Sequence, residues 1–257
     1  MDQVRLPGII GGLGPAAHVE FEKRLLSQGH MRGARRDQDY IAWVLVSATW
    51  TPERTDALLA DDTQAAVTAL ADAARRLLAA GADFAAVPCN TAHALRDAVT
   101  ARVPLPWLDL IDVTCAKLAK RYPEGSRILV LETTGTMQTG LYRKRLEAVD
   151  LVAVEFDADS SEQHDVMRAI FDEEFGIKAT GTRVDPRARA LVQQVLERSS
   201  HSIACAVTGC TELSIAFEDV MEDLVPIIDP LNVLAVSTYD AAFGLRPLPP
   251  LAATARR

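Results

Sequence analysis

The chain has 257 residues, of which 49% are hydrophobic and 24% charged, and its formal net charge at pH 7 is -8. This length predicts one or two domains, and the composition excludes a disordered chain. The acidic balance argues against nucleic acid or an anionic membrane as a partner, and no apolar run is long enough to predict a membrane span. Four cysteines are too few for a disulfide scaffold, and no signal-peptide pattern is present, so we expect a cytoplasmic protein with reduced thiols.

Short apolar runs alternate with helical patterns from end to end. Because these runs are apolar on consecutive positions, they are typical of strands buried on both faces of a parallel sheet. The predicted strands are Val4–Ile10, Ile41–Ser47, Phe84–Pro88, Arg127–Leu131, Leu151–Phe156, Ile203–Val207 and Val225–Ile228.

Three of the intervening helices have clear sequence signals. Asp61–Ala80 carries an apolar stripe and stops at Gly81, and Asp-Pro pairs open Pro186–Arg198 and Pro230–Phe243. The residues of the stripe are Val67, Leu70, Ala74, Leu77 and Leu78. Repeated alternation of strand and helix predicts an α/β fold, and Arg246–Arg257 is expected to be a frayed end.

An internal repeat indicates how the chain is divided. A strand, a Cys, a Thr and a helix occur in this order around Cys89 and again, 121 positions later, around Cys210. We therefore expect two α/β domains, residues 1–114 and 115–224, with residues 225–257 packing back on the first. Ligands of such sheets bind outside the carboxyl ends of the strands, so a pseudo-twofold arrangement would bring both cysteines to one cleft.

The two matched cysteines are the strongest chemical candidates. Each is expected where a strand passes into a helix, an environment of open N–H groups that favours a thiolate. Thr91, Thr211 and Asn90 offer hydrogen bonds at the same turns. Cys115, in a predicted helix, and Cys205, in a predicted strand, are expected to be buried apolar side chains.

Other motifs carry weaker signals. His93 follows Cys89 by four residues and could pair with it or simply cap and pack. No spacing typical of a metal site is present. The turn Gly11–Pro15 lacks the dinucleotide fingerprint, although its amides could approach a small anion. Arg54 and Lys178 lie in loop-like segments, where binding residues concentrate.

Three segments resemble the aspartate/glutamate racemase family, and its aspartate racemase branch most of all. They are Gly8–Pro15 (GIIGGLGP), Pro88–His93 (PCNTAH) and Thr208–Leu213 (TGCTEL), and further similarity extends over about residues 5 to 240. The resemblance implies two flavodoxin-like, doubly wound domains, no pyridoxal phosphate or other cofactor, no metal, and a homodimer. The activity that the resemblance implies is the interconversion of L- and D-amino acids.

The same resemblance assigns roles to individual residues. Cys89 and Cys210 match the two catalytic cysteines, one on each side of the substrate Cα. A small acidic amino acid would be held by two further sets. Asn90, Thr91, Thr133 and Thr211 match residues that bind its α-carboxylate and amino group, and Arg54 and Lys178 match those that hold its side-chain carboxylate.

Some residues depart from the family pattern and leave the substrate open. His18 replaces a Thr, Glu53 replaces an Asp, and Ala48–Trp50 replaces a smaller polar stretch near the expected pocket. A maleate-type isomerase, an arylmalonate-type decarboxylase, and a thiol redox or anion-binding module without turnover are the alternatives. The chemistry of a thiol pair favours the racemase, because racemisation needs an acid and a base on opposite faces of one carbon.

Overall fold

The computed structural model describes residues 3–217 and 224–250, and these contain two parallel sheets of four strands each. The first sheet has the order β2-β1-β3-β4 and the second the order β6-β5-β7-β8, so the same topology occurs twice. The predicted α/β fold with flavodoxin-like sheets is therefore confirmed. The strands are β1 (Pro7–Gly11), β2 (Val44–Ser47), β3 (Phe84–Ala86), β4 (Trp107–Leu108), β5 (Arg127–Leu131), β6 (Val152–Val154), β7 (Cys205–Thr208) and β8 (Ile227–Ile228).

Two compact units each contain one of these sheets. Unit 1 comprises the residues up to Val113 together with those from Leu231 onward, and unit 2 comprises Thr114–Pro230. The return to unit 1 starts later than the predicted residue 225. The reason is that β8 pairs with β7 through Ala206 and Ile227 and so completes the sheet of unit 2.

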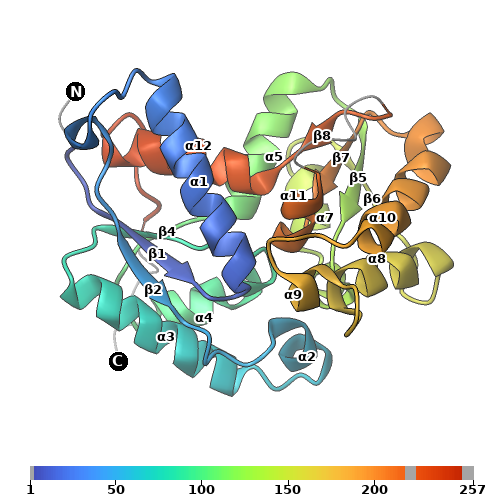
Figure 1. Cartoon of the computed structure of the whole chain (residues 1–257), viewed down its shortest axis with the longest axis horizontal. Helices are drawn as coiled ribbons and strands as arrows, with labels where there is room; N and C mark the ends of the chain where they lie inside the picture. Colours follow the sequence, from blue (N-terminus) through green and yellow to red (C-terminus); the bar gives the residue numbers. More distant parts are fainter. Residues whose placement is uncertain (1–2, 218–223, 251–257) are drawn as a thin grey trace. The chain divides into compact units, whose positions relative to one another are not determined.

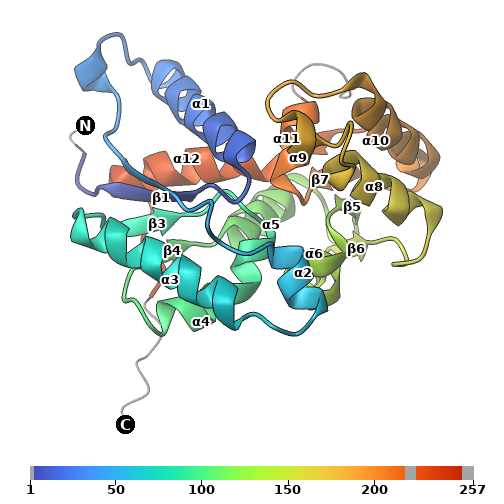
Figure 2. The same cartoon turned by 60° about the horizontal axis from the view of Figure 1, so that its bottom comes forward.

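Helices cover both faces of the sheet in unit 1 (Figures 1 and 2). Helices α1 and α12 lie on one face, and α3 and α4 lie on the other. The helices and 3-10 turns of this unit are α1 (Pro15–Met31), η1 (Asp37–Asp39), α2 (Arg54–Leu59), α3 (Gln64–Ala79), η2 (Thr91–Leu95), α4 (Arg96–Thr100) and α12 (Pro230–Ala242), with α5 (Leu110–Arg121) crossing into unit 2.

Unit 2 repeats this layering with its own helices. Helices α8 and α10 pack against each other beside the sheet, and α7 packs against β6 (Figure 1). The elements are α6 (Thr134–Thr139), α7 (Leu141–Glu147), α8 (Ser161–Phe171), α9 (Ile177–Thr180), α10 (Pro186–Ser199), η3 (Ser200–Ser202) and α11 (Thr211–Ala216). The predicted cap of α10 is present, because the Asp185 carboxylate accepts the Arg187 N–H at 2.8 Å.

The sequence predicted the strands better than their ends. β5 matches its predicted range, whereas β1, β2 and β6 are shorter than predicted. β4 was missed because its two residues follow a Pro-Leu-Pro segment and form no apolar run. On α3, Leu77 is fully buried but Leu78 is 41% exposed, because neighbouring helical residues point about 100° apart. The predicted frayed end falls partly on residues 251–257, which lie outside the described residues.

The strand order fixes where ligands would bind in each unit. In a doubly wound sheet, the crevice lies at the carboxyl ends of the two strands between which the winding reverses. These are β1 and β3 in unit 1 and β5 and β7 in unit 2. The segment that follows β3 carries Cys89, and the segment that follows β7 carries Cys210.

Candidate functional site

Cys89 lies in a tight turn after β3 and is only 5% exposed. Its backbone N–H donates to the Val87 carbonyl at 2.8 Å, and η2 begins two residues later. Asn90 and Thr91 are buried in the same turn. The turn thus places a thiol, an amide and a hydroxyl together at the reversal point of the first sheet.

His93 belongs to the support of this turn. Its ring is buried, with Nε2 3.2 Å from the Val87 carbonyl and an edge-on contact to Trp107. Burial lowers the pKa of His93 although Asp109 lies 3.8 Å from its Nδ1. A neutral imidazole donating from Nε2 therefore fits the packing interpretation, in which His93 holds the strand end that leads to Cys89.

The glycine turn after β1 is held on two sides. Gly12 has φ +81°, and a Cβ there would lie 2.7 Å from the Ala48 nitrogen, so only glycine fits. Ala48 in turn donates its N–H to the Gly11 carbonyl at 2.9 Å. One of the amides of this turn, the Gly12 N–H, donates to His18 Nδ1 at 3.0 Å.

Arg54 reaches the same turn from α2. It is buried, and its guanidinium donates to the carbonyls of Leu13 and Pro52. Glu53 caps α2 by accepting the N–H groups of Thr55 and Asp56, and one of its oxygens lies 3.7 Å from the Arg54 guanidinium. Arg54 therefore links two loops at the carboxyl edge of the first sheet.

Trp50 does not fill this edge as a buried side chain. Its ring is 47% exposed, and the Arg76 guanidinium of α3 lies over it at 5.0 Å from the ring centroid. The large Trp50 side chain, which stands in place of a smaller polar residue, therefore packs against α3.

Cys210 forms a buried polar chain in unit 2. Its Sγ donates to Glu212 Oε2 at 3.1 Å, and the other oxygen of Glu212 accepts from Lys178 Nζ at 3.0 Å. Cys210 and Glu212 are buried, whereas the Lys178 side chain is one-quarter exposed. Glu212 was not among the site residues predicted from the sequence. The only available signal was a carboxylate two residues after the matched cysteine.

The expected thiolate at Cys210 is not what this chain favours. Desolvation and the neighbouring Glu212 carboxylate raise the pKa of Cys210 well above its ordinary value, which Lys178 only partly offsets. Desolvation also opposes ionisation of Glu212, but Lys178 and the Cys210 hydrogen bond outweigh it and lower the pKa of Glu212. The resting proton therefore lies on sulfur.

Two of the three predicted threonines, Thr133 and Thr211, lie at helix starts of unit 2. Thr133 caps α6 by accepting the Thr136 N–H at 3.2 Å, and the Thr211 hydroxyl lies 3.4 Å from Glu212 Oε2. Lys178, Thr211 and Cys210 therefore converge on one carboxylate. Cys115 and Cys205 are buried in α5 and β7, as the sequence predicted.

A second buried carboxyl lies beside the Cys210 turn and was also missed. Glu132 follows β5, is 1% exposed, and has no hydrogen-bond partner on either carboxyl oxygen within residues 3–217 and 224–250. Its Cβ lies 3.0 Å from the position that a Cβ on Gly209 would take. Desolvation, assisted by Glu155, raises the pKa of Glu132 well above its usual value and so favours the neutral carboxyl.

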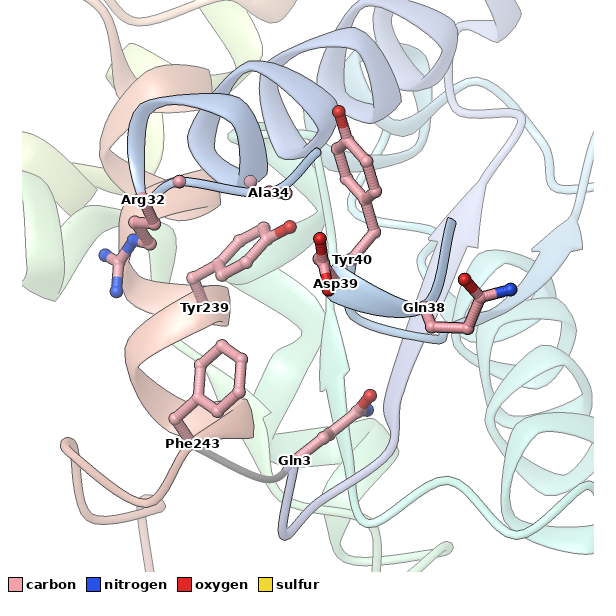
Figure 3. Close-up of a pocket in the computed structure, with 10 residues that line it drawn as sticks. Gln3, Arg32, Ala34, Gln38, Asp39, Tyr40, Tyr239 and Phe243 are labelled. Atoms are coloured by element: carbon pink, nitrogen blue, oxygen red, sulfur yellow. The ribbon is translucent and has the colours of Figure 1, made fainter. Parts of the chain in front are cut away.

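Other features of the described residues lie away from these turns. A cavity of about 690 Å³ in unit 1 is lined by Gln3 and Tyr40, which precede β1 and β2, and so belongs to the amino edge of the sheet. Figure 3 shows Tyr239 and Phe243 on one side of it and Tyr40 and Asp39 on the other. Among the described side chains, no three of His, Cys, Asp or Glu gather as metal ligands would. The helices described here include none with the length and apolarity to cross a bilayer.

Comparisons with known proteins find amino-acid racemases along nearly the whole chain. The chain is 26% identical over 232 residues to the broad specificity amino-acid racemase RacX of Bacillus subtilis (strain 168), covering 90% of this chain and 95% of that protein. The aspartate racemase of Picrophilus torridus superposes with a TM-score of 0.77 at 27% identity, covering 93% and 94% of the two chains.

A more distant solved structure shares the fold. The glutamate racemase of Francisella tularensis superposes with a TM-score of 0.61 at 18% identity, covering 94% of this chain and 82% of that one. The family model for Asp/Glu/hydantoin racemases matches residues 10–238. The chain therefore belongs to the Asp/Glu/hydantoin racemase family.

Proposed function

We propose that this protein is an amino-acid racemase that needs no cofactor, with Cys89 and Cys210 as its acid–base pair and a small acidic amino acid, such as aspartate or glutamate, as substrate. The observation that carries the proposal is the state of Cys210. It is a buried thiol at the reversal point of its sheet, donating to a charged carboxylate. A group of this kind is suited to deliver a proton.

The proposed reaction begins with Cys89 as the base. Its thiolate takes the proton from Cα, the Cα–H bond breaks, and the electron pair passes into the substrate carboxylate. Cys210 then donates its thiol proton to the opposite face of Cα, which leaves a thiol at Cys89 and a thiolate at Cys210. The reverse reaction exchanges the two roles, so atoms and charge balance in both directions.

The enediolate formed in this step must be stabilised by hydrogen-bond donors, because no electron sink takes part. Asn90 and Thr91 of one turn and Thr133 and Thr211 of the other are the proposed donors to the α-carboxylate and amino group. Arg54 and Lys178 are the proposed partners of the side-chain carboxylate. Lys178 would share its charge between the substrate and Glu212, with which it is paired in the structure.

Proton exchange in D2O tests this proposal directly. Each amino acid is incubated with the enzyme in D2O, and the α-proton signal is followed by NMR. We expect loss of the signal for aspartate or glutamate, and we expect iodoacetamide to abolish it. Retention of every α-proton signal, or full activity after alkylation of both Cys89 and Cys210, would contradict the proposal.

The proposal includes a cytoplasmic homodimer, as the family resemblance implies. Light scattering coupled to size-exclusion chromatography measures the mass of the particle directly. A mass near 27.9 kDa, that of one chain, would contradict the dimer.

A further inference from the structure

The hydrogen bond between Gly12 and His18 fixes the tautomer of this histidine. The Gly12 N–H donates to Nδ1 at 3.0 Å, so Nδ1 must be unprotonated, and the proton of the neutral ring is on Nε2. The ring packs closely on the turn, because a Cβ at Gly11 would lie 2.7 Å from the His18 Cγ. Desolvation also lowers the pKa of His18, with partial opposition from Glu22, which favours the neutral ring at pH 7.

The second nitrogen of this ring is not used by the fold. His18 is 7% exposed, and its Nε2 has no hydrogen-bond partner among the residues that the structure describes. His18 lies in the first turns of α1, whose 17 residues begin directly after β1 and its glycine turn. The Nε2–H of His18 therefore lies at the carboxyl edge of the first sheet. His18 follows β1, and Cys89 follows β3, which is the other strand at the reversal point.

We propose that His18 is a specificity-determining residue that donates its Nε2–H to an oxygen of the substrate side chain. This inference rests on the proposed racemase function. Two contacts of the glycine turn support it. His18 holds the N–H of Gly12, and Arg54 holds the carbonyl of Leu13, the next residue. The neutral donor and the buried cation thus flank one short turn, and an oxygen-bearing side chain suits both. The α-carboxylate is left to the Asn90–Thr91 turn.

Asparagine and alanine substitutions separate the two nitrogens of His18. In His18→Asn, Oδ1 can replace Nδ1 as the acceptor for Gly12, but the Nε2–H is lost. We expect KM for aspartate to rise roughly tenfold, as a lost hydrogen bond to a carboxylate implies, with little change in kcat. The inhibition constant of alanine, which has no side-chain oxygen, should stay the same. His18→Ala removes both contacts and should also weaken binding of alanine.

In His18→Asn, an equal rise in KM for aspartate and in the inhibition constant of alanine would assign the contact to the α-carboxylate and overturn the proposal. An unchanged KM for aspartate would overturn it as well, by reducing His18 to a support of Gly12. Both results presuppose a wild-type enzyme that exchanges α-protons, so failure of the proposed function is recognised first, in the D2O experiment.

If the enzyme exchanges the α-proton of no amino acid, an NMR measurement that needs no turnover still tests the role of His18. The 15N spectrum of the protein labelled at histidine gives the tautomer of each ring, and His18→Asn identifies the His18 signals among the five histidines. We expect a protonated Nε2 and an unprotonated Nδ1, and a shift of the Nε2 signal on addition of sodium succinate. A protonated Nδ1, or no shift with saturating succinate, would overturn the proposal.

Discussion

The Cys210 thiol donates to the Glu212 carboxylate at 3.1 Å, and this contact decides which atom holds the proton. The carboxylate is kept ionised by Lys178, and its charge raises the pKa of the buried thiol beside it. Cys210 is thus an acid at rest, and in the proposed reaction it becomes a base once its proton has passed to the substrate Cα. Burial raises the pKa of this thiol, the charge of Glu212 adds to the rise, and Lys178 offsets part of it.

Glu212→Gln should lower the pKa of Cys210. The substitution removes the negative charge that opposes the thiolate while Lys178 keeps its positive charge nearby. We expect alkylation of Cys210 by iodoacetamide to begin at lower pH, and racemisation to slow by about 100-fold, the lower end of what a positioned proton carrier contributes. Mass spectrometry locates the alkylated residue, and Glu197→Gln, at an exposed position of α10, is the control. An unchanged pH dependence of alkylation would refute this account of Cys210.

Lys178→Gln should destabilise the fold at neutral pH, because Glu212 would then be a buried charge without its cation. Since Lys178 is one-quarter exposed, we expect a loss of about 1–3 kcal/mol, less than for a fully buried pair. Glu212 has a lowered pKa when paired, so its stabilising contribution is present above its unfolded-state pKa and is lost as the pH falls through the folded value.

Urea unfolding at pH 7.5 and at pH 4 measures this effect. Lys178→Gln should lower the free energy of unfolding much more at pH 7.5 than at pH 4. The double variant with Glu212→Gln should recover part of this loss. The control is Lys117→Gln, an exposed lysine of α5, for which we expect almost no change. Equal losses at both pH values would mean that Lys178 acts through packing and not through its charge.

Glu132→Gln should stabilise the protein above pH 5. The folded-state pKa of Glu132 is raised, so the folded protein keeps a proton that the unfolded chain releases as the pH rises. Stability is then lost from the unfolded-state pKa upward, with a slope of at most about 1.4 kcal/mol per pH unit until the folded-state pKa is reached.

The amide of glutamine fills the same space without this dependence. Denaturant unfolding from pH 4 to pH 8 should show no gain at pH 4 and a growing gain as the pH rises. Glu124→Gln, at an exposed carboxylate, serves as the control. A variant that is less stable than the wild type at pH 8 would indicate that Glu132 is ionised and paired in solution.

Patterns along the chain predicted what depends on local sequence. Arg127–Leu131 is a strand because its four consecutive apolar residues, Ile128–Leu131, suit the inside of a sheet, and the Asp185–Pro186 pair marks a helix start by its own chemistry. The two cysteine turns were predicted because the same order of elements occurs twice. Trp107–Leu108 could not be predicted, because two residues paired to a neighbouring strand carry no periodic signal.

The errors at the candidate site have one physical cause. Spacing along the chain gives no desolvation energy and no charge balance. The thiolate predicted for Cys210 rested on the helix dipole, whereas the Glu212 carboxylate accepts a hydrogen bond from the sulfur at 3.1 Å. Likewise, the amides of the Gly11–Pro15 turn were predicted to be able to approach a small anion, but the Gly12 N–H donates to His18.

The two matched cysteines should be distinguishable by the enantiomer on which each acts. In Cys89→Ser or Cys210→Ser, racemisation should nearly disappear, because a complete turnover needs both faces of Cα. A serine hydroxyl can donate a proton but is a very poor base at neutral pH, so the remaining thiol can still exchange the α-proton of one enantiomer with solvent. We expect the two variants to exchange opposite enantiomers in D2O, as measured by NMR on L- and D-aspartate separately.

Cys115→Ser and Cys205→Ala, at the two other buried cysteines, are the matched controls and should keep the wild-type rate, with a modest loss of stability for Cys205→Ala. Exchange of the same enantiomer by both serine variants would rule out one thiol for each face, and the repeated strand–Cys–Thr–helix order would then be a repeat of the fold alone.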